Sequence, residues 1–395
     1  MRVTWYSNDP RIPTGYGAQT AQVIRRLRDD GHAIAVASNA GTVRHMSEWE
    51  GIPVYPMGVT SHSVDLISGV HHHHQGQALF TLYDVWVIGE TGVPTVSWTP
   101  IDHDPVPPEV LAHAKRPNVT TLAMSRFGQR ALMDAGVASI YIPHAIERVF
   151  RPTPSDLRAS NGIPDDAFLV VINAANRDTK DRKGFWPMFD ALGRFQKAHP
   201  DVWVYLHTWP KPTTNGLDLG WWAAERGMAL DRVRQTVPFR YIVGLVDDVE
   251  MAGIYSAGDV LLSCSKGEGF GIPVIESMAC GTPAIVTDAT AQPELVGDTG
   301  WKVPWQPEPD FGMGVTWARP DPDGILAALE ESYAERGTPR AAGRAAAAEE
   351  RARQEYDADR VYADRWRPLM AALEGDLKPR PGNTKSAKRR KAKAA

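Results

Sequence analysis

Short runs of apolar residues alternate along the chain with segments in which apolar positions have helical spacing. The first such unit has an apolar run at 2–7, a helical pattern at 18–31 and a second apolar run at 32–38. Val23, Ile24 and Leu27 fall on one face of this predicted helix. Near-continuous apolar strands that alternate with helices are typical of a parallel sheet covered on both faces. The pattern therefore predicts an α/β fold.

The same pattern recurs in two series. Further apolar runs lie at 78–89, 94–100, 119–125, 139–143, 168–176, 202–209, 259–265 and 282–288. We expect two doubly wound domains, 1–150 and 166–345, joined by a Pro- and Asp-rich linker at 151–165. Two such sheets would leave a crevice between the carboxyl ends of their strands, where ligands of open α/β sheets bind.

The last part of the chain has a different character. A helical segment at 346–375, with apolar Val361 and Trp366, is expected to pack back across both domains. The remaining 376–395 segment is basic, and we expect it to be disordered. Residues 378–395 hold eight Lys or Arg and no acid, which leaves a net charge of −12 for the rest of the chain. Such a tail suits either an anionic surface or free solvent.

Composition excludes several classes of protein. Hydrophobic residues make up 43% and charged residues 23% of the 395 positions, as in ordinary globular proteins. No apolar run is long enough to span a membrane and the start lacks the layout of a secretion signal, so we expect a cytoplasmic protein. Cys264 and Cys280 are too few for a disulfide framework or a zinc cluster. The four histidines at 71–74 are expected in a loop.

The stretch "SKGEGFGIPVIESMACGTPAIVTD" at 265–288 carries the strongest chemical signal. It predicts a glycine-rich loop after a buried strand, then a helix with Pro273 at its start and Gly281 at its end. Unpaired N–H groups at such a helix start favour phosphate. Glu268 on the loop and Glu276 in the expected first helical turn suit the hydroxyl groups of a sugar or a ribose.

This stretch resembles the E-x7-E signature of retaining nucleotide-sugar glycosyltransferases with the GT-B architecture, of the family 4-like type. The resemblance extends to "NRDTKDRKGF", to "YIPHAIERVFRP" and to "VGLVDDVEMAGIYSAGDVLLSCS", and covers residues 1 to 305. His144 and Ala145 replace the usual Asn and Gly, and Cys264 stands where proline is common. The resemblance implies two Rossmann-like domains facing across a cleft, with the acceptor on the amino-terminal side and the donor on the other.

The resemblance also implies roles for individual residues at the donor. Arg177 and Lys183 match a pair of cations that stabilise the departing diphosphate. Glu268 matches the residue near the hydroxyls of the donor sugar, and Glu276 the one that holds the ribose. The other donor-side positions are the backbone N–H groups of Phe270, Gly271 and Ile272, and two glycines of the first loop, Gly15 and Gly17.

Asp102 and His103 follow an apolar run of the first domain, so we expect them in the crevice opposite the donor site. They fall near where many relatives carry a His or Asp close to the reacting carbon, and a His can bind a sugar hydroxyl. Asp84 could contact the acceptor. Trp86 and Trp98 belong to apolar runs and are expected in the core.

The sequence thus predicts an enzyme that transfers a sugar from a nucleotide-diphosphate sugar to an acceptor hydroxyl with retention of configuration, without metal and without a cofactor. A front-face route is expected because no nucleophile stands at a family-matched position. Two alternatives remain: a sugar-nucleotide epimerase or phosphorylase of the same architecture, and a nucleic-acid-binding protein that uses the basic tail. The donor is open, as is the acceptor: a glycan, a lipid, a protein or a modified nucleobase.

Overall fold

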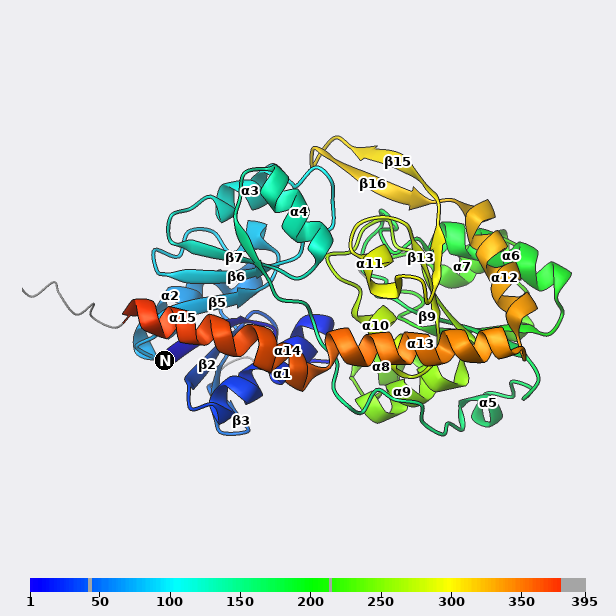
Figure 1. Cartoon of the computed structure of the whole chain (residues 1–395), viewed down its shortest axis with the longest axis horizontal. Coiled ribbons are helices and arrows are strands. Elements are labelled where there is room, and N and C mark those ends of the chain that lie inside the picture. The colour runs from blue at the N-terminus through cyan, green and yellow to red at the C-terminus, as the bar shows by residue number, and fades with distance from the viewer. Residues whose placement is uncertain (42–44, 213–214, 378–395) are drawn as a thin grey trace, which may run out of the picture.

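The computed structural model describes residues 1–41, 45–212 and 215–377, which form two α/β lobes side by side (Figure 1). Of the 376–395 tail that we expected to be disordered, residues 378–395 lie outside the described residues, whereas 376–377 belong to the last helix. Within them, each lobe is built on its own sheet, and the sheets are separate. The expected doubly wound α/β fold is confirmed.

The amino-terminal sheet has the strand order β3-β4-β2-β1-β5-β6-β7-β8, and all its described pairs are parallel except β3 with β4. Its strands are β1 (Arg2–Ser7), β2 (Ala33–Ser38), β3 (Ser47–Trp49), β4 (Ile52–Tyr55), β5 (Ala78–Leu82), β6 (Thr95–Thr99), β7 (Val119–Ala123) and β8 (Ser139–Tyr141). Its helices are α1 (Gly15–Asp29), the 3-10 turn η1 (Ser61–Ser63), α2 (Val64–His73), the 3-10 turn η2 (Val85–Val87), α3 (Pro108–Ala114) and α4 (Arg126–Asp134).

The carboxyl-terminal sheet has the order β11-β10-β9-β12-β13-β14 and is parallel throughout. Its strands are β9 (Phe168–Asn173), β10 (Val202–His207), β11 (Val233–Gln235), β12 (Val260–Ser263), β13 (Ala284–Thr287) and β14 (Trp301–Val303). Its helices are α6 (Phe185–Ala198), α7 (Leu219–Glu225), η3 (Leu230–Arg232), α8 (Pro238–Ile242), α9 (Asp248–Ala257), α10 (Ile272–Ala279), α11 (Gln292–Val296) and α12 (Pro322–Glu335). The short helix α5 (Leu157–Ser160) lies within the expected linker.

In each sheet the strand order reverses beside the first strand, between β1 and β5 and between β9 and β12. These switch points are where open α/β sheets bind ligands. The loops after β5, β6, β9 and β12 carry most of the candidate site residues.

A two-stranded antiparallel hairpin, β15 (Trp305–Asp310) and β16 (Val315–Pro320), follows β14 and precedes α12 along the chain. The sequence pattern did not predict it. Its first strand contains Pro307 and Pro309 and is largely exposed, so it lacks the apolar run of a sheet strand. In Figure 1 the hairpin runs from the carboxyl-terminal lobe toward α3 and α4 of the other lobe.

The chain returns to the amino-terminal lobe through α13 (Pro339–Tyr356), α14 (Ala358–Val361), a π-helical turn η4 (Tyr362–Trp366) and α15 (Arg367–Leu377). Helix α13 packs on α10, and α15 lies along the amino-terminal lobe (Figure 1). Trp366 is buried, with its ring centroid 4.9 Å from that of Trp98 and 5.9 Å from that of Trp5. This burial of aromatic area fixes the end of the chain to the first sheet.

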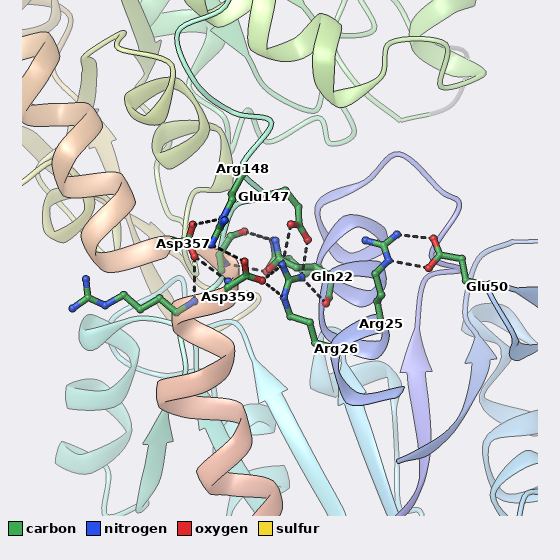
Figure 2. A network of polar contacts seen from close by, with 11 residues as sticks. Gln22, Arg25, Arg26, Glu50, Glu147, Arg148, Asp357 and Asp359 are labelled. Atoms are coloured by element: carbon green, nitrogen blue, oxygen red, sulfur yellow. Dashed lines mark hydrogen bonds and ion pairs between the residues drawn. The ribbon is translucent and has the colours of Figure 1, made fainter. Parts of the chain in front are cut away.

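The chain passes between the lobes twice, near Ile146 and near Asp357, and these two crossings lie side by side. The N–H of Ile146 donates to the carbonyl of Tyr356 at 2.8 Å, and the N–H of Ala358 donates back to Ile146 at 3.0 Å. Figure 2 shows the ion pairs around this point: Arg26 of α1 lies 2.7 Å from Glu147 and 2.8 Å from Asp359. The guanidinium of Arg26 in the amino-terminal lobe therefore forms an ion pair with a carboxylate beside each crossing.

Two minor expectations were wrong. Trp98 is buried as expected, but Trp86 is 47% exposed because the chain leaves the sheet after Leu82 and turns into η2. His71, His72 and His73 form the last turn of α2 rather than a loop. No helix within the described ranges is long and apolar enough to cross a membrane.

Candidate active site at the lobe interface

The glycine-rich loop at 264–271 joins the carboxyl end of β12 to the start of α10. Gly271 caps the helix with φ +115°, a backbone conformation that side chains disfavour. Gly281, with φ +80°, follows the end of the helix. The loop-to-helix geometry read from the sequence is confirmed. Glu276, however, lies in the second turn of α10 rather than in the first, because the helix begins at Ile272.

Glu268 is the centre of a cluster of cations. Its Oε1 accepts a hydrogen bond from Lys183 Nζ at 2.5 Å and one from Ser265 Oγ at 2.6 Å. Arg182 Nη1 lies 3.5 Å from the other carboxylate oxygen. Burial raises the pKa of Glu268, but Lys183 and Arg182 outweigh it and hold this pKa at about 2. The carboxylate is therefore ionised at any physiological pH.

The glycine loop packs directly against the loop after β6 in the other lobe. A Cβ atom on Gly269 would lie 2.7 Å from Pro100 Cβ, and one on Gly267 would lie 2.3 Å from the carbonyl oxygen of Asp102. Real Cβ atoms do not approach other atoms so closely, so only glycine allows this contact. The structure therefore shows the two lobes closed on each other at the candidate site.

Arg182, which the sequence analysis did not single out, joins the two sides. Its Nη1 donates to the carbonyl of Gly267 at 2.9 Å. Its charge also lowers the pKa of Asp102 and opposes the rise in the pKa of Asp84, which burial and Asp102 bring to about 6. Arg182 stands next to Lys183 in the run "KDRK", and that adjacency was the available signal.

Arg177 is exposed and forms no ion pair or hydrogen bond with another described residue. Its charge opposes the rise in pKa that burial causes in Tyr83 of the amino-terminal lobe and in Tyr241 of the other lobe. The charge of Arg177 therefore acts on a tyrosine of each lobe, but the structure does not bring Arg177 into contact with Lys183 or Glu268.

Glu276 has a different environment from Glu268. Its Oε2 accepts a hydrogen bond from the hydroxyl of Tyr255 at 2.8 Å, and Asn173 Nδ2 donates to the same hydroxyl at 2.6 Å. No cation among the described residues pairs with this carboxylate, and Asp248 adds to the negative charge nearby. Burial is the main cause that raises the pKa of Glu276 to about 7.

Asp102 and His103 lie on the amino-terminal side of the interface. His103 Nδ1 is 2.6 Å from Asp102 Oδ1, and the imidazole is 1% exposed. Burial raises the pKa of Asp102, but His103 and Arg182 lower it below its ordinary value. We expected both side chains in the crevice between the lobes. His103 lies at this interface, where Trp317 covers it with its ring centroid 4.1 Å away.

Comparisons with known proteins agree with this geometry. Residues 218–315, which include Glu268 and Glu276, match the family "Glycosyl transferases group 1". A phosphatidyl-myo-inositol mannosyltransferase of Mycobacterium tuberculosis is 26% identical over 341 residues, which are 82% of this chain and 86% of that protein. An O-antigen chain mannosyltransferase B of Escherichia coli is 35% identical over 83 residues, only 21% of this chain and 20% of that protein.

Solved structures extend the likeness to the whole fold. Sucrose-phosphate synthase from Thermosynechococcus elongatus superposes with a TM-score of 0.75 at 17% identity, covering 94% of this chain and 100% of that one. Anabaena HepE, solved with UDP and glucose, gives a TM-score of 0.67 at 18% identity, with the same coverage. Together, the family match, the relatives and the shared fold support a GT-B glycosyltransferase of the family 4-like type.

In this glycosyltransferase, the first loop touches the helix that follows the glycine-rich loop. A Cβ on Gly15 would lie 3.2 Å from Ile272 Cδ1, so Gly15 is at the interface. A Cβ on Gly17 would lie 2.1 Å from the carbonyl oxygen of Ile12, so the turn itself requires that glycine.

The side chain of Phe270 belongs to the core and packs against His144 and Tyr356, with ring centroids 5.2 and 5.6 Å away. The backbone N–H groups of Phe270, Gly271 and Ile272 donate to no other described residue. The start of α10 therefore offers three donors at the lobe interface.

Proposed function

We propose that this glycosyltransferase moves a sugar from a nucleotide-diphosphate sugar to an acceptor hydroxyl with retention of configuration and without a metal ion. The observation that carries the proposal is the cluster of Glu268, Lys183 and Arg182, which adjoins the donors at the start of α10 and faces Asp102 across the interface. We further propose that the donor binds the 166–345 domain and the acceptor the 1–150 domain.

The cations serve the leaving group. When the bond between sugar C1 and the diphosphate breaks, negative charge grows on the phosphate oxygens. Lys183 and Arg182 are held beside the site by Glu268 and by the Gly267 carbonyl, so little reorganisation is needed to meet that charge. The N–H groups at the start of α10 add the positive end of the helix dipole. Arg177, which is exposed, is proposed to reach the same diphosphate.

The two glutamates serve hydroxyl groups. Glu268 is ionised and a strong acceptor for the donor sugar. Glu276 is proposed to bind the ribose. The ribose hydroxyl groups would add hydrogen-bond donors to the one that Tyr255 supplies among the described residues.

Transfer on the front face completes the step. The bond from C1 to the diphosphate breaks, the bond from C1 to the acceptor oxygen forms on the same face, and the acceptor proton passes to a diphosphate oxygen. Asp102 and His103 line the acceptor side and are proposed to orient hydroxyl groups.

The relatives suggest which donors to test first. The M. tuberculosis relative is named a mannosyltransferase, and another match of 35% identity over 72 residues is named as GDP-mannose-dependent. GDP-mannose is therefore the first donor to test, and UDP-glucose the second, because UDP and glucose occupy the HepE structure.

The decisive experiment measures release of nucleoside diphosphate and sugar transfer to a panel of glycan, lipid and protein acceptors. Replacement of Lys183 with Ala or of Glu268 with Gln is expected to lower kcat by about 10²–10³-fold. Replacement of the exposed Lys197 on α6 with Ala serves as the matched control and should leave kcat unchanged. Wild-type turnover in both site variants would contradict the proposal.

Four further experiments separate the alternatives. Full activity in a chelator supports metal independence, and complete loss contradicts it. NMR of the product anomer should show the configuration of the donor. Incubation with the donor alone should give no epimer; an epimer would favour an epimerase. Unchanged activity and binding after deletion of 378–395 would remove any role of the basic tail.

A further inference from the structure

The β15–β16 hairpin belongs to the carboxyl-terminal half of the chain but pairs with the other lobe. Thr316 forms an antiparallel bridge with Asp104, directly after His103. On the other side, the N–H of Ala318 donates to the carbonyl of Lys266 at 2.9 Å, in the glycine-rich loop. The second strand therefore lies between the loop that carries Glu268 and the loop that carries His103.

Ion pairs hold this strand in place. The ammonium of Lys266, which is buried, lies 2.8 Å from Glu308 of the first strand. Lys180 lies 2.6 Å from Asp310, and that same carboxylate accepts a hydrogen bond from Trp317 Nε1 at 3.3 Å. The position of the Trp317 ring is thus fixed through Asp310 as well as through the backbone.

The Trp317 ring closes the space around His103. The two ring planes meet at 68° with their centroids 4.1 Å apart, and Trp317 is only 8% exposed. A Cβ on Gly267 would lie 3.3 Å from Cζ3 of the indole. The indole therefore fills the layer between the glycine-rich loop and the imidazole.

Nδ1 of His103 lies 2.6 Å from Asp102 Oδ1, whereas Nε2 forms no hydrogen bond with the described residues. The side chain is 1% exposed, so solvent does not satisfy it either. Buried polar groups are nearly always paired, and an exception calls for a functional explanation.

We infer that Trp317 is a positioning residue, which holds the His103 imidazole so that Nε2 meets a substrate hydroxyl. The inference rests on the proposed function, because a sugar or acceptor hydroxyl is the partner that Nε2 lacks. The lobes must part to admit a substrate, and His103 and Trp317 come from opposite lobes. Trp317 therefore restores the orientation of the imidazole each time the lobes close.

The test is a double-mutant cycle in which kcat and KM are measured with the donor and acceptor that the wild-type enzyme uses. Trp317→Ala is expected to lower kcat about tenfold or more, with KM for the donor nearly unchanged, because misplacement of a reacting group costs rate rather than binding. Trp317→Phe should restore most of kcat, since it keeps an aromatic face. The double variant of Trp317→Ala with His103→Ala should be no slower than His103→Ala alone.

Trp305→Ala is the matched control, because Trp305 lies in the same hairpin but donates to the carbonyl of Asp288, away from His103. It should keep wild-type kcat. Hydrolysis of the donor in the absence of acceptor shows whether His103 meets a hydroxyl of the donor sugar or of the acceptor. If the Trp317→Ala and His103→Ala variants lose hydrolysis as well as transfer, His103 lies at the donor sugar. If they lose transfer alone, His103 lies at the acceptor.

Losses that multiply in the double variant would overturn the inference, as would a folded Trp317→Phe variant as slow as Trp317→Ala. Either result leaves the proposed function intact if the wild-type chain transfers sugar. A wild-type chain that transfers no sugar from any nucleotide sugar refutes the proposed function, and this inference falls with it.

Discussion

Replacement of Glu276 with Gln is expected to raise the stability of the fold and, at the same time, to weaken the binding of nucleotide. Its carboxyl is buried beside Asp248 with no cation among the described residues, and its pKa of about 7 lies well above the ordinary value of 4.5. Replacement with Gln keeps the shape and removes the charge. The folded state holds a proton on Glu276 that the unfolded chain releases above pH 4.5, so the free energy of unfolding of the wild type falls as pH rises from 4.5 to about 7.

The size of the effect follows from the two pKa values. The difference between 4.5 and about 7 corresponds to about 3 kcal/mol, an upper bound because water can enter as the lobes move. Glu276→Gln should therefore match the wild type near pH 4.5 and be more stable by about 1–3 kcal/mol at pH 8. For a lobe of this size, each kcal/mol moves Tm by about 2–4 °C.

The assay is thermal unfolding at pH 4.5 and pH 8 for the wild type, Glu276→Gln and Glu225→Gln. Glu225 is exposed on α7 of the same lobe, so its variant should follow the wild type at both pH values. A Glu276→Gln variant whose advantage is equal at both pH values would refute the argument from burial. GDP or UDP should then stabilise the wild type more than the variant at pH 8, because ribose hydroxyls donate to a carboxylate.

Three further outcomes are expected. Arg26→Ala should lower the free energy of unfolding by about 1–3 kcal/mol in urea titration because it leaves Glu147 unpaired, whereas the more exposed pair of Arg25 with Glu50 should cost under about 1 kcal/mol when Arg25 is replaced. Gly269→Ala should hold the lobes apart, because its Cβ would meet Pro100 at 2.7 Å; a larger radius of gyration in X-ray scattering would show this, and an unchanged radius would contradict it. Glu268, with its pKa of about 2, should stabilise the fold above pH 4.5 and lose that contribution as pH falls toward 2; Lys183→Met should weaken this acid dependence in denaturation midpoints, and an identical dependence would count against the pair.

Local sequence was sufficient for the loop and helix that carry the site. Gly271 and Gly281 adopt backbone angles that other residues disfavour, and Pro273 suits a helix start, so residues 265–281 could form little else. The order of apolar runs was likewise enough for two doubly wound sheets, because each run must be buried on both faces. The E-x7-E resemblance then indicated the family.

Side-chain pairing across long separations could not be predicted in the same way. Arg177 matched the family pattern, but it is Arg182 that the fold brings to Gly267 and Glu268, 85 and 86 positions away. Trp86 looked like a core residue because its run is apolar, and only the end of β5 at Leu82 shows that the chain has left the sheet. The roles proposed for the site residues stay predictions until they are tested.

By itself, the sequence determined which segments fold as strands and helices and where glycine and proline punctuate them, because those preferences act over a few neighbouring residues. Only the tertiary structure decided that Trp317 covers His103, that no described cation pairs with Glu276 and that Arg26 forms ion pairs with Glu147 and Asp359. Those facts depend on which distant side chains are packed together and shielded from water. Burial of this kind is a property of the whole fold rather than of any segment.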